Sequence, residues 1–404
     1  MNVSTSQIPL KKERLHELDW LRVMAFSLLV FYHGSFIFSG GFYVSNSANI
    51  PFLSTLMTFI SQWRLPLLFF ISGASVAFLY KKSSTGEFVN SRLTRILVPL
   101  VFGVLIINPP QSYIAKGFKE GSFPYYPSYY AESLANIHFG SGEALKWNHL
   151  WYLVYIFVFS IILIPMFHFF KKNPEILQKI GDFFTRRGML LLLILPPFIS
   201  GILLQLDWPT KRNLISDWDN FTTTILFFIY GYLLYSHSGI RAMIMKYRTV
   251  FLILGICCFI AMALLFKPGQ ATAFIQIGEV SPAFIGYKFL RVLNTGCWLL
   301  CILGFAQKYL RFRNNFLNYT SEAVYPFYIL HQTVMVFIAY FVVQWQMMPL
   351  LKYIVIMALT FMNTLLIYEF LIKRTAVTRL LFGLRTKVAE KDKMIISPQT
   401  QKVA

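Results

Sequence analysis

The sequence predicts an all-α, polytopic membrane protein, and three observations lead to this prediction. Of the 404 residues, 56% are hydrophobic and only 13% are charged, whereas soluble domains carry about 25% charged residues. The chain contains ten apolar runs near the roughly 20 residues that a helix needs to cross a bilayer. The basic residues gather in alternate connections between these runs.

The ten runs follow one another along almost the whole chain, and the third and sixth are short. They define one membrane domain at 18–372, between tails at 1–17 and 373–404, with a large outer connection at 108–148. We expect the spans at Leu18–Phe38, Leu53–Tyr80, Leu93–Ile107, Leu150–Phe170, Met189–Leu206, Phe221–Tyr235, Val250–Phe266, Phe284–Phe305, Ala323–Val343 and Leu350–Ile372.

The distribution of charge orients this domain. With a cytoplasmic N-terminus, 26 of the 37 Lys and Arg lie on the inner side and 9 on the outer side, while Arg22 and Arg64 lie within spans. Inner connections of membrane proteins carry such an excess. We therefore expect both termini in the cytoplasm and the basic C-terminal tail beside anionic lipid. Most of the net charge of +20 is thereby explained without a nucleic-acid partner.

Several chemistries have no sequence support. The four cysteines lie in apolar runs, where cysteine behaves as a small hydrophobic residue. The chain has no H-x3-H, CxxC or H-E-x-x-H spacing, no P-loop and no GxGxxG. We therefore expect no bound metal and no nucleotide fold.

The first span contains two ionisable residues, Arg22 and His33, which are costly inside a bilayer. Eleven residues correspond to about three helical turns, so both side chains lie on one helix face, about 16 Å apart along the axis. The second span carries Arg64 at the expected depth of His33, with Pro66 and Gly73 positioned to interrupt the helix beside a cavity. A buried cation beside the imidazole favours its neutral form, which can accept a proton.

Arg92 and Arg95 stand at the expected start of the third span. Their i, i+3 spacing places both guanidinium groups on one face, and a helix N-terminus adds backbone donors for an anion. The pair is typical of a phosphate site, although a simple topology signal explains the spacing equally well.

Two further polar clusters complete the candidate residues. Asn148, His149 and Trp151 lie at the outer end of the fourth span, and His331 lies within the ninth. Trp151 suits either an interfacial aromatic belt or a surface for stacking a sugar. His331 alone is compatible with a simple hydrogen bond to a neighbouring helix.

Taken in order, these clusters resemble the acyltransferase 3 family of bacterial membrane-bound O-acyltransferases, and within it the branch of the periplasmic-glucan succinyltransferase. The resemblance covers residues 18–372 and rests on five ordered motifs: LDWLRVMAFSLLVFYH, WRLPLLFFISG, RLTR, NHLWYL and YPFYILHQ.

The resemblance implies a ten-helix enzyme that moves an acyl group, acetyl or succinyl, from cytoplasmic acyl-CoA to a hydroxyl of an extracytoplasmic carbohydrate. It implies a catalytic role for His33, assisted by Arg22, and donor binding by Arg92 and Arg95. For a succinyl group, Arg64 is a candidate partner of the free carboxylate. The remaining residues expected to bind substrate are Trp63, Arg64, His149, Trp151 and His331.

Two other classes of function compete with this one. Intramembrane Arg and His also suit a transporter or flippase for an envelope saccharide, whereas a structural membrane protein does not need Arg22 and His33 on one face. For the enzyme, the expected location is the bacterial cytoplasmic membrane, and a homo-oligomer is compatible with the sequence.

Overall fold

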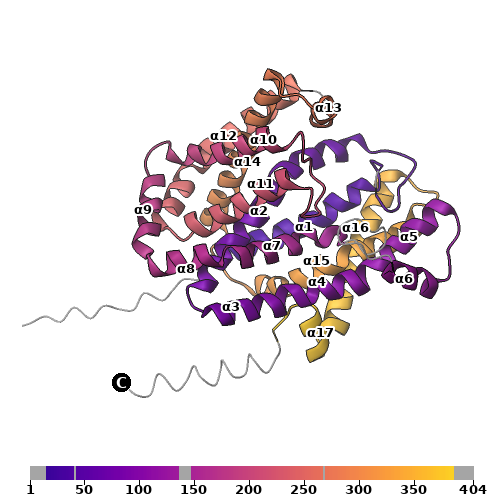
Figure 1. Ribbon diagram of the computed structural model, residues 1–404. Coiled ribbons are helices and arrows are strands. Elements are labelled where there is room, and N and C mark those ends of the chain that lie inside the picture. The colour runs from indigo at the N-terminus through magenta and orange to yellow at the C-terminus, as the bar shows by residue number, and fades with distance from the viewer. Residues whose placement is uncertain (1–14, 41, 136–146, 267–268, 386–404) are drawn as a thin grey trace, which may run out of the picture.

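The computed structural model describes residues 15–40, 42–135, 147–266 and 269–385, and every regular element in these ranges is helical (Figure 1). The all-α prediction is thereby confirmed. Most of the two expected tails, at 1–14 and 386–404, and residues 136–146 of the expected outer connection lie outside the described ranges.

The N-terminal part of the chain contains two long helices and a third helical run interrupted by π turns. Its elements are α1 (His16–Phe36), α2 (Pro51–Tyr80), α3 (Thr85–Arg92), the π turn η1 (Leu93–Leu97), α4 (Val98–Phe102), the π turn η2 (Gly103–Ile107), α5 (Asn108–Glu120) and α6 (Tyr126–Ala135). The expected connection at 108–148 thus begins as helix, because α5 prolongs the third run by thirteen residues.

The rest of the chain contains bent helices followed by long straight ones. The bent part comprises η3 (Asn148–Leu150), α7 (Trp151–Ile162), α8 (Ile164–Lys172), α9 (Pro174–Phe184), η4 (Met189–Ile194) and α10 (Leu195–Leu204). The remainder comprises α11 (Trp218–Leu234), α12 (Ser238–Leu265), α13 (Gln270–Ile277), α14 (Pro282–Tyr309), α15 (Asn315–Val342), α16 (Pro349–Ile367), the π turn η5 (Tyr368–Ile372) and α17 (Ala376–Leu381).

Six helices in the described ranges are long and apolar enough to cross a membrane, or eight if each bent helix pair counts as one span. The two remaining predicted spans correspond to α1, which contains Arg22 and His33, and to α11, which has 17 residues. Each expected run therefore coincides with helix, and the number of ten crossings stays a prediction.

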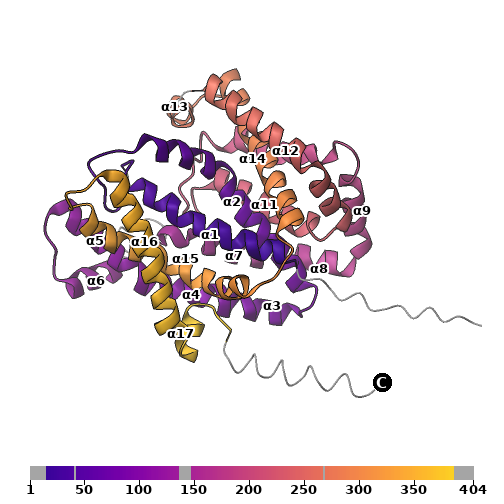
Figure 2. The same cartoon turned by 180° about the vertical axis from the view of Figure 1, so that it is seen from behind.

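The helices pack around a centre formed by α1, α2 and α7, as both ribbon views show (Figures 1 and 2). On one side, α2 packs along α11 and α12 packs along α14. On the other side, α15 packs against α1, α5 and α16. Helices from the two ends of the chain therefore meet at the centre.

Two local features of α2 fix its neighbours. A Cβ at Gly73 would lie 1.8 Å from the Phe228 carbonyl oxygen, and one at Gly231 would lie 1.9 Å from that of Phe70, so the glycines permit backbone contact between α2 and α11. The expected interruption at Gly73 is therefore wrong, because α2 runs through it and the residue serves packing.

Pro66 is also accommodated within α2. It has no N–H to offer the carbonyl four residues earlier, and that carbonyl, of Gln62, accepts a hydrogen bond of 2.9 Å from the Thr295 hydroxyl on α14. The side chain of Gln62 accepts from Asn294 as well. The proline thus creates a polar link between α2 and α14 instead of a break.

Candidate active site

Six arginines surround a cavity of about 640 Å³, which we call the arginine chamber. The helices α1, α2, α7, α15 and α17 and the π turn η1 contribute to its lining. Glu322 is the one carboxylate among the described residues that line it, so this part of the structure gives the chamber a strongly positive interior. The arginines are Arg22, Arg92, Arg95, Arg313, Arg379 and Arg385.

Neighbouring polar and aromatic groups hold these arginines in place. Arg22 donates to the Ser75 hydroxyl at 2.7 Å and pairs with Asp19 at 3.2 Å. Arg379 pairs with Glu322 at 2.9 Å. The guanidinium of Arg92 lies 4.8 Å from the ring centroid of Phe88, and its buried Nε has no partner in the described structure. The chamber therefore retains donors for an anionic ligand.

Arg92 and Arg95 do not lie at a helix N-terminus, contrary to the expectation from sequence. The helical run begins at Thr85, where Ser84 and Glu87 form a capping box, and not at the arginines. The free backbone donors of a helix N-terminus belong to its first turn, so they lie away from Arg92 and Arg95. Anion binding here depends on the guanidinium groups alone.

Part of the C-terminal segment lines this chamber, through Arg379, Gly383 and Arg385, and the expected position of the basic tail beside anionic lipid stays a prediction. Arg379 is 4% exposed, and its Nε donates to the Arg385 carbonyl at 2.7 Å. Gly383 has φ +68°, and a Cβ there would lie 2.8 Å from the carbonyl oxygen of Arg95. The turn after α17 therefore packs against η1, which the basic composition of the tail did not indicate.

His33 lines a second, small cavity of about 30 Å³, which we call the histidine chamber. Arg64 lines the same chamber, at the depth expected from sequence, with its guanidinium 3.8 Å from the ring centroid of Tyr32. Arg64 is 2% exposed, and its Nε and Nη1 have no partner among the described residues.

Two more histidines stand beside His33. The ring of His331 lies 5.5 Å from that of His33 and 5.2 Å from that of His149, measured between centroids. Nδ1 of His331 faces the Tyr328 carbonyl at 2.7 Å, and Nε2 of His149 faces the Ile329 carbonyl at 3.1 Å. Because a carbonyl only accepts, these nitrogens carry hydrogen. His331 Nε2 and His149 Nδ1 remain buried and unpartnered within the described structure.

Trp151 and Arg212 form one wall of the histidine chamber, and the sequence did not indicate a role for Arg212. Trp151 is 5% exposed, so it is not part of an interfacial belt, and the guanidinium of Arg212 lies 5.2 Å from its ring centroid. Arg212 comes from the loop before α11 and has φ +60°. The Trp147 indole donates to its carbonyl at 2.6 Å.

Asp217 anchors the loop that carries Arg212. It is fully buried and accepts hydrogen bonds from the Lys211 backbone, from the Tyr155 hydroxyl and from the Asn220 amide, the last at 2.7 Å. A carboxylate with several donors is a strong local tether. In the sequence, the only sign of this tether is the acidic residue Asp217 itself, at the end of the loop before α11.

The arginine and histidine chambers are neighbours, since Phe26 and Tyr152 line both. Tyr152 is held by hydrogen bonds to the Ser72 hydroxyl at 2.6 Å and to the Leu68 carbonyl at 3.3 Å. Arg22 therefore faces the arginine chamber while His33 faces the histidine chamber. The structure separates their environments although they belong to one helix.

A third cavity, of about 330 Å³, adjoins the histidine chamber on another side, and we call it the Lys288 chamber. The two cavities share Tyr32, Arg64, Leu65 and Arg212. Lys288 and Arg291, which line this chamber from α14, were not among the substrate-binding residues expected from the sequence.

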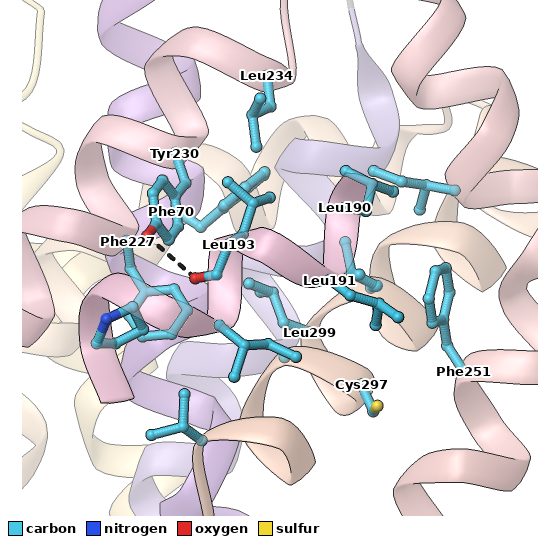
Figure 3. Close-up of a pocket in the computed structure, with 16 residues that line it drawn as sticks. Phe70, Leu190, Leu191, Leu193, Phe227, Tyr230, Leu234, Phe251, Cys297 and Leu299 are labelled. Atoms are coloured by element: carbon cyan, nitrogen blue, oxygen red, sulfur yellow. Dashed lines mark hydrogen bonds between the residues drawn. The ribbon is translucent and has the colours of Figure 1, made fainter. Parts of the chain in front are cut away.

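One expected substrate residue lies apart from the chambers. Trp63 packs edge-on against Phe59, with ring centroids 6.0 Å apart, and is not among the residues that line the three chambers. A fourth cavity, of about 40 Å³, is apolar apart from the Tyr230 hydroxyl, which donates to the Leu193 carbonyl at 3.0 Å (Figure 3). Its lining suits packing and offers no catalytic group.

Metal chemistry has no candidate ligand set here: no group of three or more His, Cys, Asp or Glu side chains in the described ranges could hold an ion.

Comparison with known proteins identifies a family and several distant relatives. A family model described as an acyltransferase domain matches residues 15–369. The chain is 26% identical over 174 residues to the glucans biosynthesis protein C of Salmonella paratyphi B and of Salmonella heidelberg. These matches cover 42% of this chain and 43% of each relative, less than half of the relatives' length. No solved structure matches the chain.

Proposed function

This chain belongs to the acyltransferase family whose domain model spans residues 15–369, and we propose that it transfers an acyl group, acetyl or succinyl, from cytoplasmic acyl-CoA to a hydroxyl of an extracytoplasmic carbohydrate of the cell envelope. The observation that carries the proposal is the adjacency of two unlike chambers. One is large and rich in arginine, the other is small and lined by His33 and His149 with His331 beside them, and Phe26 and Tyr152 line both.

The arginine chamber suits the phosphates of coenzyme A. Guanidinium groups bind phosphate with paired hydrogen bonds, and six arginines face one carboxylate in this cavity. Arg92, Arg95, Arg313, Arg379 and Arg385 all come from segments that the charge distribution assigns to the cytoplasm. The donor would therefore enter from the side on which acyl-CoA is made.

The histidine chamber suits the chemical step. With the phosphates in the arginine chamber, the pantetheine arm would pass Phe26 and Tyr152 and present the thioester to His33. His33 would take the proton of the acceptor hydroxyl as that oxygen attacks the thioester carbonyl carbon. Collapse of the tetrahedral intermediate breaks the carbon–sulfur bond, and the imidazolium returns the proton to the thiolate. Arg64 would stabilise negative charge on the carbonyl oxygen.

The size of the histidine chamber favours group transfer over saccharide transport. Its volume is about 30 Å³, and a single water needs about 10–15 Å³ on the same scale. A short acyl group fits such a space, whereas a sugar unit does not pass through it. This supports the acyltransferase over the transporter.

The test uses the purified protein in lipid nanodiscs. We would measure thiol release from acetyl-CoA and succinyl-CoA with a glucose oligosaccharide as acceptor. We expect His33→Ala to lower the transfer rate at least about 100-fold, the range for loss of a general base, with acyl-CoA affinity unchanged by calorimetry. His168→Ala, at an exposed histidine, is the matched control and should behave like the parent protein.

Two results would overturn the proposal. One is full thiol release by His33→Ala. The other is saccharide flux into proteoliposomes without any consumption of thioester, which would favour the transporter.

A further inference from the structure

The Lys288 chamber carries more positive charge than its surroundings balance. Of the residues that the structure describes, four cationic side chains and one carboxylate, that of Asp219, line it. The cations are Arg64, Arg212, Lys288 and Arg291. Amide and hydroxyl groups complete the lining, including those of Gln62, Asn220 and Thr295.

The buried cations have few protein partners. Lys288 Nζ lies 3.8 Å from Asp219 Oδ1, beyond hydrogen-bond distance, and both side chains are at most 10% exposed. Arg291 donates to the Tyr287 hydroxyl at 2.9 Å. Arg64, 2% exposed, has two guanidinium nitrogens without a partner in the described structure. This chamber therefore offers buried donors to a ligand.

The backbone makes room for these cations. A Cβ at Gly201 on α10 would lie 2.2 Å from Cε and 2.3 Å from Nζ of Lys288, so the lysine lies directly against a glycine. The loop tether at Asp217 and the indole of Trp147 hold Arg212 on another side. Unpaired charge in a membrane interior is costly and marks binding sites, and a guanidinium matches carboxylate or phosphate geometry.

The location of the chamber indicates which substrate it serves. It shares Arg64 and Arg212 with the histidine chamber, whereas no described residue lines both it and the arginine chamber. A molecule bound here would thus approach His33 from a different side than the acyl-CoA phosphates. Its volume of about 330 Å³ lies at the lower end of known ligand pockets, enough for one sugar unit.

We infer that the Lys288 chamber binds an acidic group, carboxylate or phosphate, carried by the carbohydrate acceptor close to the hydroxyl that is acylated. The inference rests on the proposed acyltransferase function and adds the class of acceptor. Lys288 and Arg291 bind the acidic group, while Arg64 and Arg212 connect its site to the histidine chamber.

The test compares acceptors with one donor, acetyl-CoA, held constant. The probes are a glucose tetrasaccharide, the same tetrasaccharide with one glucuronate, and the same with one 6-phosphate. We expect the parent protein to prefer an acidic probe at least tenfold in kcat/KM. Lys288→Gln and Arg291→Gln should each lower the ratio of acidic to neutral kcat/KM at least tenfold. Lys308→Gln, exposed at the far end of α14, is the control.

Other results would overturn the inference. One is equal use of neutral and acidic probes by the parent protein. Another would appear when the neutral tetrasaccharide is assayed with each donor in turn: if Lys288→Gln abolished transfer from succinyl-CoA and left transfer from acetyl-CoA unchanged, the anion would belong to the acyl group. Arg291→Lys retains the charge and should keep part of the preference, which separates binding from misfolding.

Calorimetry of the acidic tetrasaccharides without donor distinguishes the inference from the proposed function. Binding that Lys288→Gln weakens would support the acidic subsite even if no thiol were released. Absence of binding by a protein that does release thiol would overturn the subsite alone.

Discussion

The arginine chamber and the Lys288 chamber are both positively charged, but they are built differently. The first is about 640 Å³ in volume, and its cations are all arginines, largely from helix ends and from the segment after η5. The second is about 330 Å³ and combines four cations, three of them from the helices α2 and α14, with amides and hydroxyls. Arginines alone suit phosphates, whereas a mixed polar lining suits a sugar with an acidic group. Equal sign of charge therefore does not imply the same ligand.

The largest expected effect that would test this difference is on donor binding in the arginine chamber. Replacing Arg92 and Arg95 together by Lys keeps the charge but removes the paired hydrogen bonds of guanidinium. We expect the KM for acyl-CoA to rise about tenfold or more, equivalent to at least about 1.4 kcal/mol, with the KM for the acceptor unchanged. Steady-state kinetics with each substrate varied in turn provide the measurement.

The double substitution Arg186→Lys with Arg187→Lys, at two exposed arginines, is its matched control. Unaltered acyl-CoA affinity in the Arg92 and Arg95 variant would show that the pair is only a topology signal.

A smaller effect is expected on acceptor binding in the Lys288 chamber when Asp217 is replaced. Asp217→Asn replaces a buried carboxylate that accepts from Lys211, Tyr155 and Asn220, and it brings an NH₂ group toward those donors. We expect the loop of Arg212 to loosen, the acceptor KM to rise about threefold to tenfold, and about 2 kcal/mol of stability to be lost.

Donor KM should stay constant in Asp217→Asn, because the arginine chamber shares no lining residue with this loop. Asp207→Asn, in the exposed part of the same connection, is the control for kinetics and thermal unfolding. A matching rise in donor KM would contradict the independence of the two chambers.

The smallest effect concerns the link between α2 and α14, which form part of the Lys288 chamber. Thr295→Val removes the hydroxyl that donates to the Gln62 carbonyl left free by Pro66. Interhelical hydrogen bonds in membranes contribute about 0.6 kcal/mol on average and about 1.7 at most. We expect a loss of stability in this range by thermal unfolding, with donor KM unchanged.

Thr58→Val is the matched control for Thr295→Val. Thr58→Val removes a hydroxyl that bonds only within α2, to the Ser54 carbonyl, and should leave stability close to that of the parent protein. Equal losses in both variants would argue against a specific role for Thr295.

Much of the candidate site could be predicted from local sequence. The histidine chamber is lined by His33, Arg64, His149 and Trp151, and the ring of His331 lies beside that of His33. An ionisable or polar residue in an apolar run needs a polar environment, which is why the sequence could indicate them. Trp63 was grouped with them through its motif, yet its ring packs on Phe59. Adjacency in a motif did not determine the direction of its side chain.

The all-α membrane class, the positions of the apolar helices and the costly polar residues within them could all be predicted from the amino-acid sequence. These properties depend on composition and periodicity within about 20 residues, so a short stretch of sequence is enough to predict them. Three contacts were found only in the folded structure: Arg379, Arg385 and Arg92 surround one cavity, Arg212 lies against Trp151, and Lys288 lies buried against Gly201. Such contacts join segments far apart in the chain, and they arise from helix packing and loop tethers that no single segment encodes.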